Sequence, residues 1–411
     1  MYYALLSSLL VVMVSVTQAQ EYIYPVEVVP MSSHSEPDIY NGLFLIHQES
    51  PDHLELLLWN PVTKVTTKGL LSTFTPAGFK ILPDGKGFSF VDKGGRILVK
   101  SFSKRSPKSI QLYEPIKDIA IIDWIDARSF YFMGKEAQHY AVFQADLNGF
   151  VYPIIKNPKK DYMHPSKVDN QLFFIQRDGH NYSICQSHYP AIEDDTHLIT
   201  DNDEYKRQVE ALLNSTTQEK KASVQDEDIK VIIDLHDQSA AFLKMISPTE
   251  GLYVEYPQEI LRNDKLVHFA YCHIFKTEQG WERKVLFNFS LPTHFFLTTN
   301  DFRLYESLLP LLPRYINGSL FFMSCDDEEE LKTVVFRYDF NSCKMRRISQ
   351  KTGNGPLGTS FFSPVKLNSM IFFGGTVSVD EEYEAHAHNL PSMWINDDGF
   401  VCVDLPFVFN S

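Results

Sequence analysis

Short runs of aromatic and aliphatic residues recur along the chain, and most of them follow a small or polar residue. The first four runs are GLFLI at Gly42, GFSFV at Gly87, SFYFM at Ser129 and QLFFI at Gln171. Later runs of the same kind are GLYVE at Gly251, SLFFM at Ser319 and MIFFG at Met370. The first four begin about 42 to 45 residues apart, so the pattern indicates a repeated structural unit.

Each interval has the same internal order of apolar and polar segments. In the second unit, GFKIL, FSFV, RILVKSF and SIQLY are separated by the turns PDGKG and DKGG and the loop SKRSPK. The third unit reads IAIIDW, SFYFM, HYAVFQAD and FVYPII, again with polar turns between the runs. Four strands per unit are predicted. Runs without alternation, such as SFYFM, are expected where a strand is covered on both faces.

An interval of 40 to 45 residues with four strands is typical of one β-propeller blade. The 31 Phe and 20 Tyr beside only 4 Trp favour an all-β chain, because aromatic residues suit packed, pleated surfaces. We predict one propeller domain over residues 21–411, with seven blades favoured; six also fit the weak late boundaries. The segment Glu21 to Val29 is expected to complete the last blade.

The charged segment 201–229 interrupts this pattern. Tyr205, Val209, Leu212 and Leu213 share one helical face, which predicts a short helix followed by a loop. We interpret the segment as an insertion between blades. A tolerated surface excursion is favoured over a lid that binds a partner.

One unit carries a recognisable turn, in the stretch GFKILPDGKGFSFVDKGGRILVKSF at residues 78–102. Pro83, Asp84 and Gly85 suit a tight turn, since they supply a fixed φ, a hydrogen-bond acceptor and a positive φ respectively. With Lys86 and the apolar strands that follow, this stretch resembles the blade repeat of the TolB-like, WD40-like propellers. Leu82 replaces the usual Ser. The resemblance implies a propeller fold and a class that includes periplasmic scaffold proteins and the propeller domains of some peptidases.

Charge and composition limit the partners. The formal net charge is −14, and a field of that sign repels phosphate backbones, so we expect no nucleic-acid partner. The one basic stretch, Lys100 to Lys108, is interpreted as a solvated hairpin loop, because it offers few aromatic side chains for base stacking.

Residues 1–19 predict a signal peptide. About fifteen mostly apolar residues from Tyr2 to Val16 are too few to cross a bilayer, and small residues precede a cleavage point after Ala19. No Lys or Arg precedes the apolar run, so a membrane anchor or a first buried strand remains the alternative. We expect an exported protein, periplasmic or secreted, that is monomeric and not an integral membrane protein after cleavage.

The cysteines do not predict a metal site. Cys185, Cys272, Cys325, Cys343 and Cys402 are scattered and lack C-x-x-C spacing, so buried thiols with at most one or two disulfides are expected. Four N-x-S/T sequons, at Asn181, Asn214, Asn288 and Asn317, would accept glycans only in a eukaryotic secretory pathway.

The stretch DEEYEAHAHN contains the candidate metal ligands. His386 and His388 are two residues apart and would share one face of a strand, together with Glu382 and Glu384. Two imidazoles and a carboxylate can bind zinc, but a solvated hairpin loop is the favoured interpretation. The acidic run Asp326 to Glu330 lacks the spacing of a calcium loop.

The chain contains no G-x-S-x-G elbow, no P-loop and no G-x-G-x-x-G after a strand. We therefore predict a non-catalytic propeller without a cofactor, which binds a protein partner through its loop face or central channel. The alternative is a propeller hydrolase or lyase, metal-assisted in one version, with its site at the channel mouth.

Overall fold

The computed structural model describes residues 21–409 except 33–38, 51–52, 61–64, 73, 85–86, 93–94, 102–107, 113–114, 191–223, 237, 258–264, 293–313, 317, 328–331, 348–361, 368–369, 378–388, 397–398 and 407. The side-chain contacts below come from residues 80–346. The predicted helix at Tyr205 to Leu213 and the predicted signal peptide lie outside the described residues.

The described strands form seven groups of four consecutive strands. The first group is β1 (Glu21–Ser32), β2 (Ile39–Ser50), β3 (His53–Asn60) and β4 (Val65–Ser72). The second is β5 (Phe74–Ile81), β6 (Gly87–Asp92), β7 (Ile97–Ser101) and β8 (Lys108–Ile110). The third is β9 (Lys117–Trp124), β10 (Ser129–Glu136), β11 (His139–Asp146) and β12 (Val151–Ile155). The fourth is β13 (Asp161–Val168), β14 (Gln171–Asp178), β15 (Asn181–His188) and β16 (Lys230–His236).

The later groups continue this order. The fifth is β17 (Ser239–Ser247), β18 (Glu250–Tyr256), β19 (Leu266–Thr277) and β20 (Gly280–Pro292). The sixth is β21 (Arg314–Ile316), β22 (Ser319–Asp327), β23 (Lys332–Asp339) and β24 (Lys344–Arg347). The seventh is β25 (Phe362–Leu367), β26 (Met370–Val377), β27 (Asn389–Asn396) and β28 (Gly399–Pro406), followed by β29 (Val408–Phe409).

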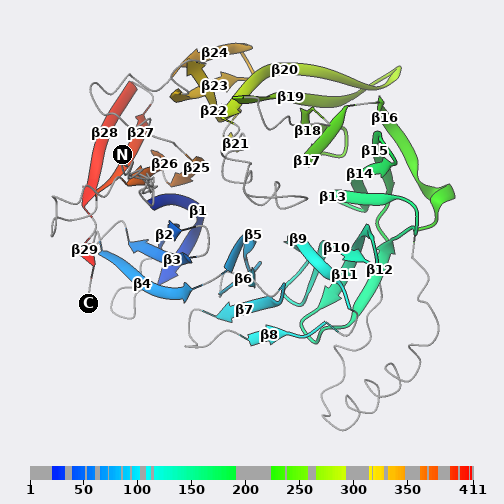
Figure 1. Cartoon of the computed structure of the whole chain (residues 1–411), viewed down its shortest axis with the longest axis horizontal. Helices are drawn as coiled ribbons and strands as arrows, with labels where there is room; N and C mark the ends of the chain where they lie inside the picture. Colours follow the sequence, from blue (N-terminus) through cyan, green and yellow to red (C-terminus); the bar gives the residue numbers. More distant parts are fainter. Residues whose placement is uncertain are drawn as a thin grey trace, which may run out of the picture.

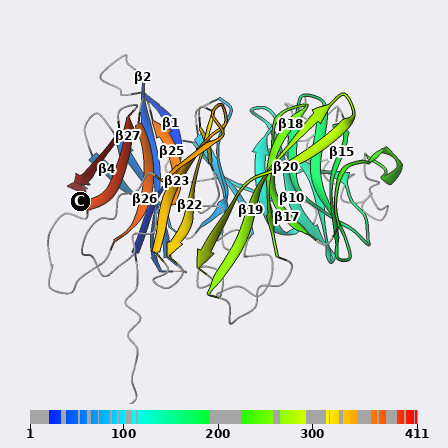
Figure 2. The same cartoon turned by 90° about the horizontal axis from the view of Figure 1, so that it is seen from above.

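The groups follow one another around a ring, with β5, β9, β13, β17 and β21 nearest its centre (Figure 1). Groups two to six are each a four-stranded antiparallel sheet in which chain neighbours pair. Seen from above, the strands run between the two faces of the ring (Figure 2). We refer to groups two to six as the second to sixth sheets.

The ends of the chain meet through β1. This strand pairs with β2 from Tyr22↔Gln48 to Ser32↔Ile39, and with β26 only over Glu21–Ile23. It therefore contacts the last group, as predicted, but it belongs to the first group. The prediction that β1 completes the last unit is wrong, because its main partner is β2. Antiparallel strands joined by a short connection usually pair with each other.

The unalternating runs are covered on both faces, as expected. Phe130 and Phe132 on β10 lie in one cluster with Val91 of the second sheet. Tyr131, between them, lies in a different cluster with Phe174 of the fourth sheet. One strand thus supplies side chains to two cores, because successive side chains point to opposite faces of a sheet.

The recognisable turn of the second sheet is closed by a hydrogen bond from the Leu82 N–H to the Gly87 carbonyl, 2.9 Å long. Pro83 and Asp84 are exposed at its tip. A side chain at Gly87 would collide with the Lys100 carbonyl on β7, so the glycine permits the close approach of two strands.

In chain order the charged insertion falls between two strands of the fourth sheet and not between two sheets. It connects β15 to β16, which pair with each other from Tyr182↔His236 to Gln186↔Lys230. The expectation of an insertion between blades is wrong, because a long segment between two paired strands looks in sequence like the end of a unit. A short 3-10 helix, η2 (Asp226–Asp228), follows the insertion.

Asp226 holds the returning chain against the connection between the third and fourth sheets. Its carboxylate accepts hydrogen bonds from Tyr162 Oη at 2.9 Å, Asn157 Nδ2 at 2.9 Å and Lys160 Nζ at 3.3 Å. Desolvation opposes the charged form of Asp226, but these hydrogen bonds and the lysine charge outweigh it and lower the pKa below its usual value.

The up-and-down order of the strands defines two faces of the ring. On one face, which we call the pocket face, the second strand of each group connects to the third and the fourth connects to the next group. On the opposite face, the insertion face, the first strand connects to the second and the third to the fourth. The basic stretch between β7 and β8 and the segment between β15 and β16 both leave from the insertion face.

Candidate functional site

The predicted metal ligands His386 and His388 lie outside the described residues. They fall between β26 and β27. Of the acidic run, Asp326 and Asp327 form the end of β22, and the rest lies outside the described residues. Within the part of the chain that is described, no three His, Cys, Asp or Glu side chains come together as a metal site. The metal site at His386 and His388 stays a prediction.

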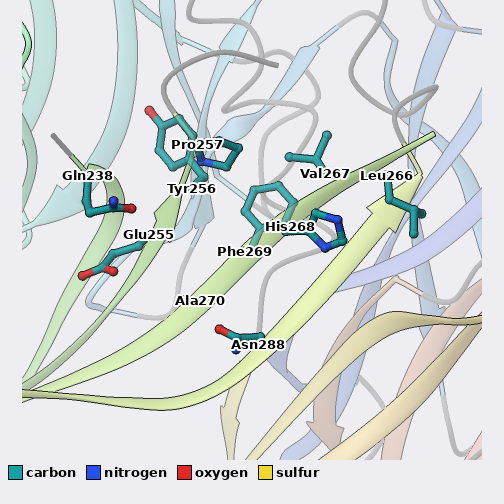
Figure 3. Close-up of a pocket in the computed structure, with 10 residues that line it drawn as sticks. All are labelled: Gln238, Glu255, Tyr256, Pro257, Leu266, Val267, His268, Phe269, Ala270 and Asn288. Carbon is teal, nitrogen blue, oxygen red and sulfur yellow. The ribbon is translucent and has the colours of Figure 1, made fainter. Parts of the chain in front are cut away.

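A cavity of about 370 Å³ opens on the pocket face at the end of the fifth sheet. Its lining comes from the start of β19, the end of β18, one position on β20 and the short connection between β16 and β17 (Figure 3). The polar lining residues are Gln238, Glu255, His268 and Asn288. Tyr256 and Phe269 are the aromatic residues of a largely apolar remainder.

A single row of residues across three strands explains the cavity. Glu255 on β18 is directly opposite Ala270 on β19, and Ala270 is directly opposite Asn288 on β20. Residues opposite each other in a sheet share one face. The small Ala270 therefore leaves space between a carboxylate and an amide.

This row lies on the face of the fifth sheet that is directed toward the fourth sheet. Further along the same face, Tyr253 and Cys272 join a core cluster with Phe173 and Ile175 of the fourth sheet. The opposite face packs on the sixth sheet, where the rings of Phe287 and Phe322 stack with centroids 4.0 Å apart. The row of Glu255, Ala270 and Asn288 in the cavity thus lies on the face of the fifth sheet that is directed toward the fourth sheet.

Glu255 is a buried carboxylate with fixed partners. It is 6% exposed, and its Oε1 accepts a hydrogen bond of 2.6 Å from Tyr253 Oη. The same oxygen forms an ion pair with Arg283 Nη1. Burial, followed by the neighbouring Cys272 and Glu255, raises the pKa of Tyr253 well above its usual value, so the phenol stays a donor. Hydrogen bonding to Tyr253 is the leading cause that raises the pKa of Arg283.

His268 lies at the rim of the cavity. Its Nδ1 is 2.8 Å from Ser290 Oγ, and the side chain is otherwise exposed. The Ser290 N–H in turn donates to Ser324 Oγ of the sixth sheet at 3.1 Å. The hydrogen bond between Ser290 and Ser324 therefore links the rim of the cavity to the sixth sheet.

A second buried carboxylate lies on the pocket face, between the third and fourth sheets. Asp161 is 4% exposed and accepts hydrogen bonds from the Tyr140 N–H at 2.8 Å and from Arg177 Nη2 at 2.7 Å. His139 Nδ1 is 3.4 Å from Asp161 Oδ1. An imidazole beside a fixed carboxylate is an arrangement that can serve acid–base chemistry.

Within residues 80–346 none of the four cysteines forms a disulfide, and two of them are buried. Burial raises the pKa of both Cys185 and Cys272 to about 12, so these thiols are unreactive at neutral pH. Cys325 is half-buried. Cys343 is exposed, contrary to prediction, because it lies in the turn between β23 and β24 with a positive φ.

Two of the four sequons are described at their asparagine, and both side chains are exposed. Asn181 begins β15, and Asn288 lines the cavity. Asn214 and Asn317 lie outside the described residues.

The sequence contained one usable signal for the cavity. In the aligned runs SFYFM, QLFFI and GLYVE, the fifth position is Met133, Ile175 and Glu255. A charged residue in place of two core residues indicates a specialised position. Asn288 and Ala270 carried no such signal, because only strand pairing brings them beside Glu255.

Among solved structures, the chain is similar to a puromycin-hydrolysing peptidase of Mycobacterium tuberculosis, with a TM-score of 0.53 and 8% sequence identity. The match covers 94% of this chain and 54% of the peptidase, so the chain spans about half the length of that protein. At such low identity the likeness shows the fold alone. The fold is a β-propeller. Each four-stranded group is one blade.

Two further matches have lower scores than the peptidase. An oligogalacturonate lyase of Vibrio parahaemolyticus matches with a TM-score of 0.48 and 9% identity, over 90% of this chain and 96% of the lyase. A putative TolB from Agrobacterium tumefaciens matches with a TM-score of 0.37 and 14% identity, over 66% and 88%. No protein-family model and no curated protein matches the sequence. The described part of the chain contains no helix capable of spanning a bilayer.

Proposed function

We propose that this propeller binds a protein partner on its pocket face, in the cavity at the end of the fifth sheet. The observation that supports this proposal is the row of Glu255, Ala270 and Asn288 across three strands, which leaves a space lined by both polar and apolar groups. A volume of about 370 Å³ is within the range of ligand sites.

The polar groups suit recognition of a polypeptide. Asn288 and Gln238 are exposed amides, and an amide offers a donor and an acceptor side by side, as a peptide unit does. Glu255 is committed to Tyr253 and Arg283 through one oxygen, so it is a fixed acceptor. Fixed polar groups around an apolar floor favour binding and orientation over proton transfer.

The finer features of the proposal come from the sequence. Residues 78–102 resemble the TolB-like blade repeat, which supports a scaffold or binding protein. Residues 1–19 support export to the periplasm or secretion, after which residues 21–411 would act as one monomeric propeller domain.

The proposal is tested by site-specific photo-crosslinking of the mature protein in an envelope extract at low salt. A photoreactive phenylalanine analogue at position 268 is expected to give one discrete adduct, and this adduct is lost when Ala270→Leu fills the cavity. The same analogue at Glu278, an exposed position on the insertion face, is the control. No adduct at position 268, or equal adducts at both positions, contradicts the proposal.

A hydrolase or lyase is the second candidate, and one observation favours it. His139 lies beside the buried Asp161, and a buried carboxylate can orient an imidazole for general-base catalysis. Turnover of peptide or oligosaccharide substrates that is lost in His139→Ala would support this candidate. Bound metal that is lost in the His386→Ala, His388→Ala double variant would support its metal-assisted version.

A further inference from the structure

The carboxylate of Glu255 gives the cavity a defined charge. Of the ten residues that line it, Glu255 is the only one with a formal charge when histidine is neutral (Figure 3). The whole chain carries −14, so its long-range field also attracts cations and repels anions. Both terms favour a positively charged ligand group, although Glu255 already shares its charge with Arg283, which lies outside the lining.

Glu255 keeps capacity for a further partner. Tyr253 and Arg283 both contact the same oxygen, Oε1. An ionised carboxylate has two oxygens with about four acceptor positions in all, so these two contacts do not exhaust it. Arg283 does not line the cavity. We therefore expect a ligand in the cavity to approach the carboxylate from a different side.

Burial makes this position selective. The Glu255 side chain is 8% exposed, whereas that of Arg283 is 40% exposed. A hydrogen bond to an ionised group is roughly twice as strong as a neutral one, and low exposure reduces competition from water. An uncharged side chain in the cavity would gain much less from Glu255 than a cationic one.

The apolar lining suits the stem of such a side chain. Leu266, Phe269 and Ala270 provide the apolar surface beside the carboxylate. Lys and Arg side chains commonly lay their methylene groups along apolar surface while the charged head reaches a polar group. The exposed amides of Gln238 and Asn288 remain for the peptide backbone on either side of that residue.

We propose that the cavity recognises an arginine or lysine side chain within an extended segment of the partner protein, with its cationic head on Glu255. This proposal rests on the proposed function and specifies the class of partner segment. It predicts that recognition depends on the positive charge of one side chain, in addition to its shape.

Isothermal titration calorimetry with synthetic peptides at low salt tests it. The probe is the blocked pentapeptide acetyl-Ala-Ala-Arg-Ala-Ala-amide, and the comparison peptide has citrulline, an uncharged isostere, in place of arginine. The arginine peptide is expected to bind about tenfold or more tightly than the citrulline peptide, because the charged hydrogen bond is lost. Equal binding of the two peptides overturns the proposal without any change to the protein.

Variants locate the effect. Glu255→Gln preserves the shape of the side chain and removes its charge, so it should abolish the preference for arginine over citrulline. Glu250→Gln is the matched control, because Glu250 lies on the same strand at the insertion face, bonded to His273 at 2.8 Å. A preference that persists in Glu255→Gln, or that is lost in Glu250→Gln, contradicts the proposal.

The outcomes separate this proposal from the function on which it rests. If both peptides bind equally and Ala270→Leu abolishes the binding of both, the cavity binds peptides and the charge preference is wrong. If neither peptide binds and the position-268 adduct is absent, the proposed function itself fails. If the adduct forms but does not depend on Glu255, the partner uses the cavity without a basic side chain.

Discussion

Glu255 and Asp161 are buried carboxylates on the pocket face, and each is paired with an arginine of its own sheet. Glu255 has Arg283 and the Tyr253 hydroxyl, and Asp161 has Arg177 and a backbone N–H. A buried charge is stable only when it is paired and hydrogen-bonded. Removing either arginine would leave such a charge uncompensated.

His164 makes stability depend on pH at the residue scale. It is 1% exposed with a φ of 50°, and burial lowers its pKa to about 3. Because its usual pKa is about 6.5, the unfolded chain binds a proton below that pH while the folded chain does not. Its contribution to stability is present above pH 6.5 and is lost as the pH falls toward 3.

We predict that the wild-type protein loses about 1.5 kcal/mol more unfolding free energy between pH 6.5 and pH 5 than His164→Asn does. Asparagine tolerates the positive φ and does not titrate. Urea unfolding at the two pH values measures the difference, and His180→Asn at an exposed position is the control. Equal pH dependence in wild type and His164→Asn would show that this histidine is not buried in its neutral form.

At the scale of elements, the innermost strands are irregular where neighbouring blades meet. β13 has a register shift between Met163 and Ser166, and β17 has one between Ala241 and Lys244. Ser166 Oγ accepts a hydrogen bond of 2.9 Å from the Met245 N–H on β17, in a buried position. The bulge on one strand thus satisfies a backbone group of the next blade.

Ser166→Ala is expected to destabilise the protein by about 1–3 kcal/mol, because it leaves a buried backbone N–H without its acceptor. Chemical denaturation measures the loss, with the exposed Ser109→Ala on β8 as control. A change in Ser166→Ala no larger than that of the control would mean that this hydrogen bond contributes little to the joining of the two blades.

The strands themselves were largely predictable from the sequence. The four runs predicted in each of the second and third units overlap β5–β8 and β9–β12, since most of these apolar runs are bounded by turns with Gly, Asp or Asn. The pairing of distant segments was not predictable in the same way. The insertion was predicted to lie between two blades, but β16 follows it and pairs with β15 of the same blade. A sequence pattern predicts where strands are and does not show which strands pair.

The candidate site was less predictable than the fold. His386 and His388 attracted attention because histidines two apart suggest a metal site, and that site stays untested. The cavity depends on Glu255, Ala270 and Asn288, which come from three different strands. Only Glu255 departs from the apolar pattern of the aligned runs. Ala270 and Asn288 are ordinary strand residues, and only the pairing of the strands brings them beside Glu255.

At the scale of the whole molecule, the two faces of the ring differ in what they carry. The cavity with Glu255 and the cluster of His139, Asp161 and Arg177 both lie on the pocket face. The charged segment follows the end of β15 on the insertion face, whereas Asp226 holds the returning chain at the connection between β12 and β13, which belongs to the pocket face.

The cavity at the end of the fifth blade is proposed to bind a basic side chain. A crystal structure of the mature protein with the arginine pentapeptide would locate that side chain. We expect the guanidinium within hydrogen-bond distance of the Glu255 carboxylate, with the peptide backbone beside Asn288. A peptide bound elsewhere, such as against the innermost strands at the centre of the ring, would contradict it.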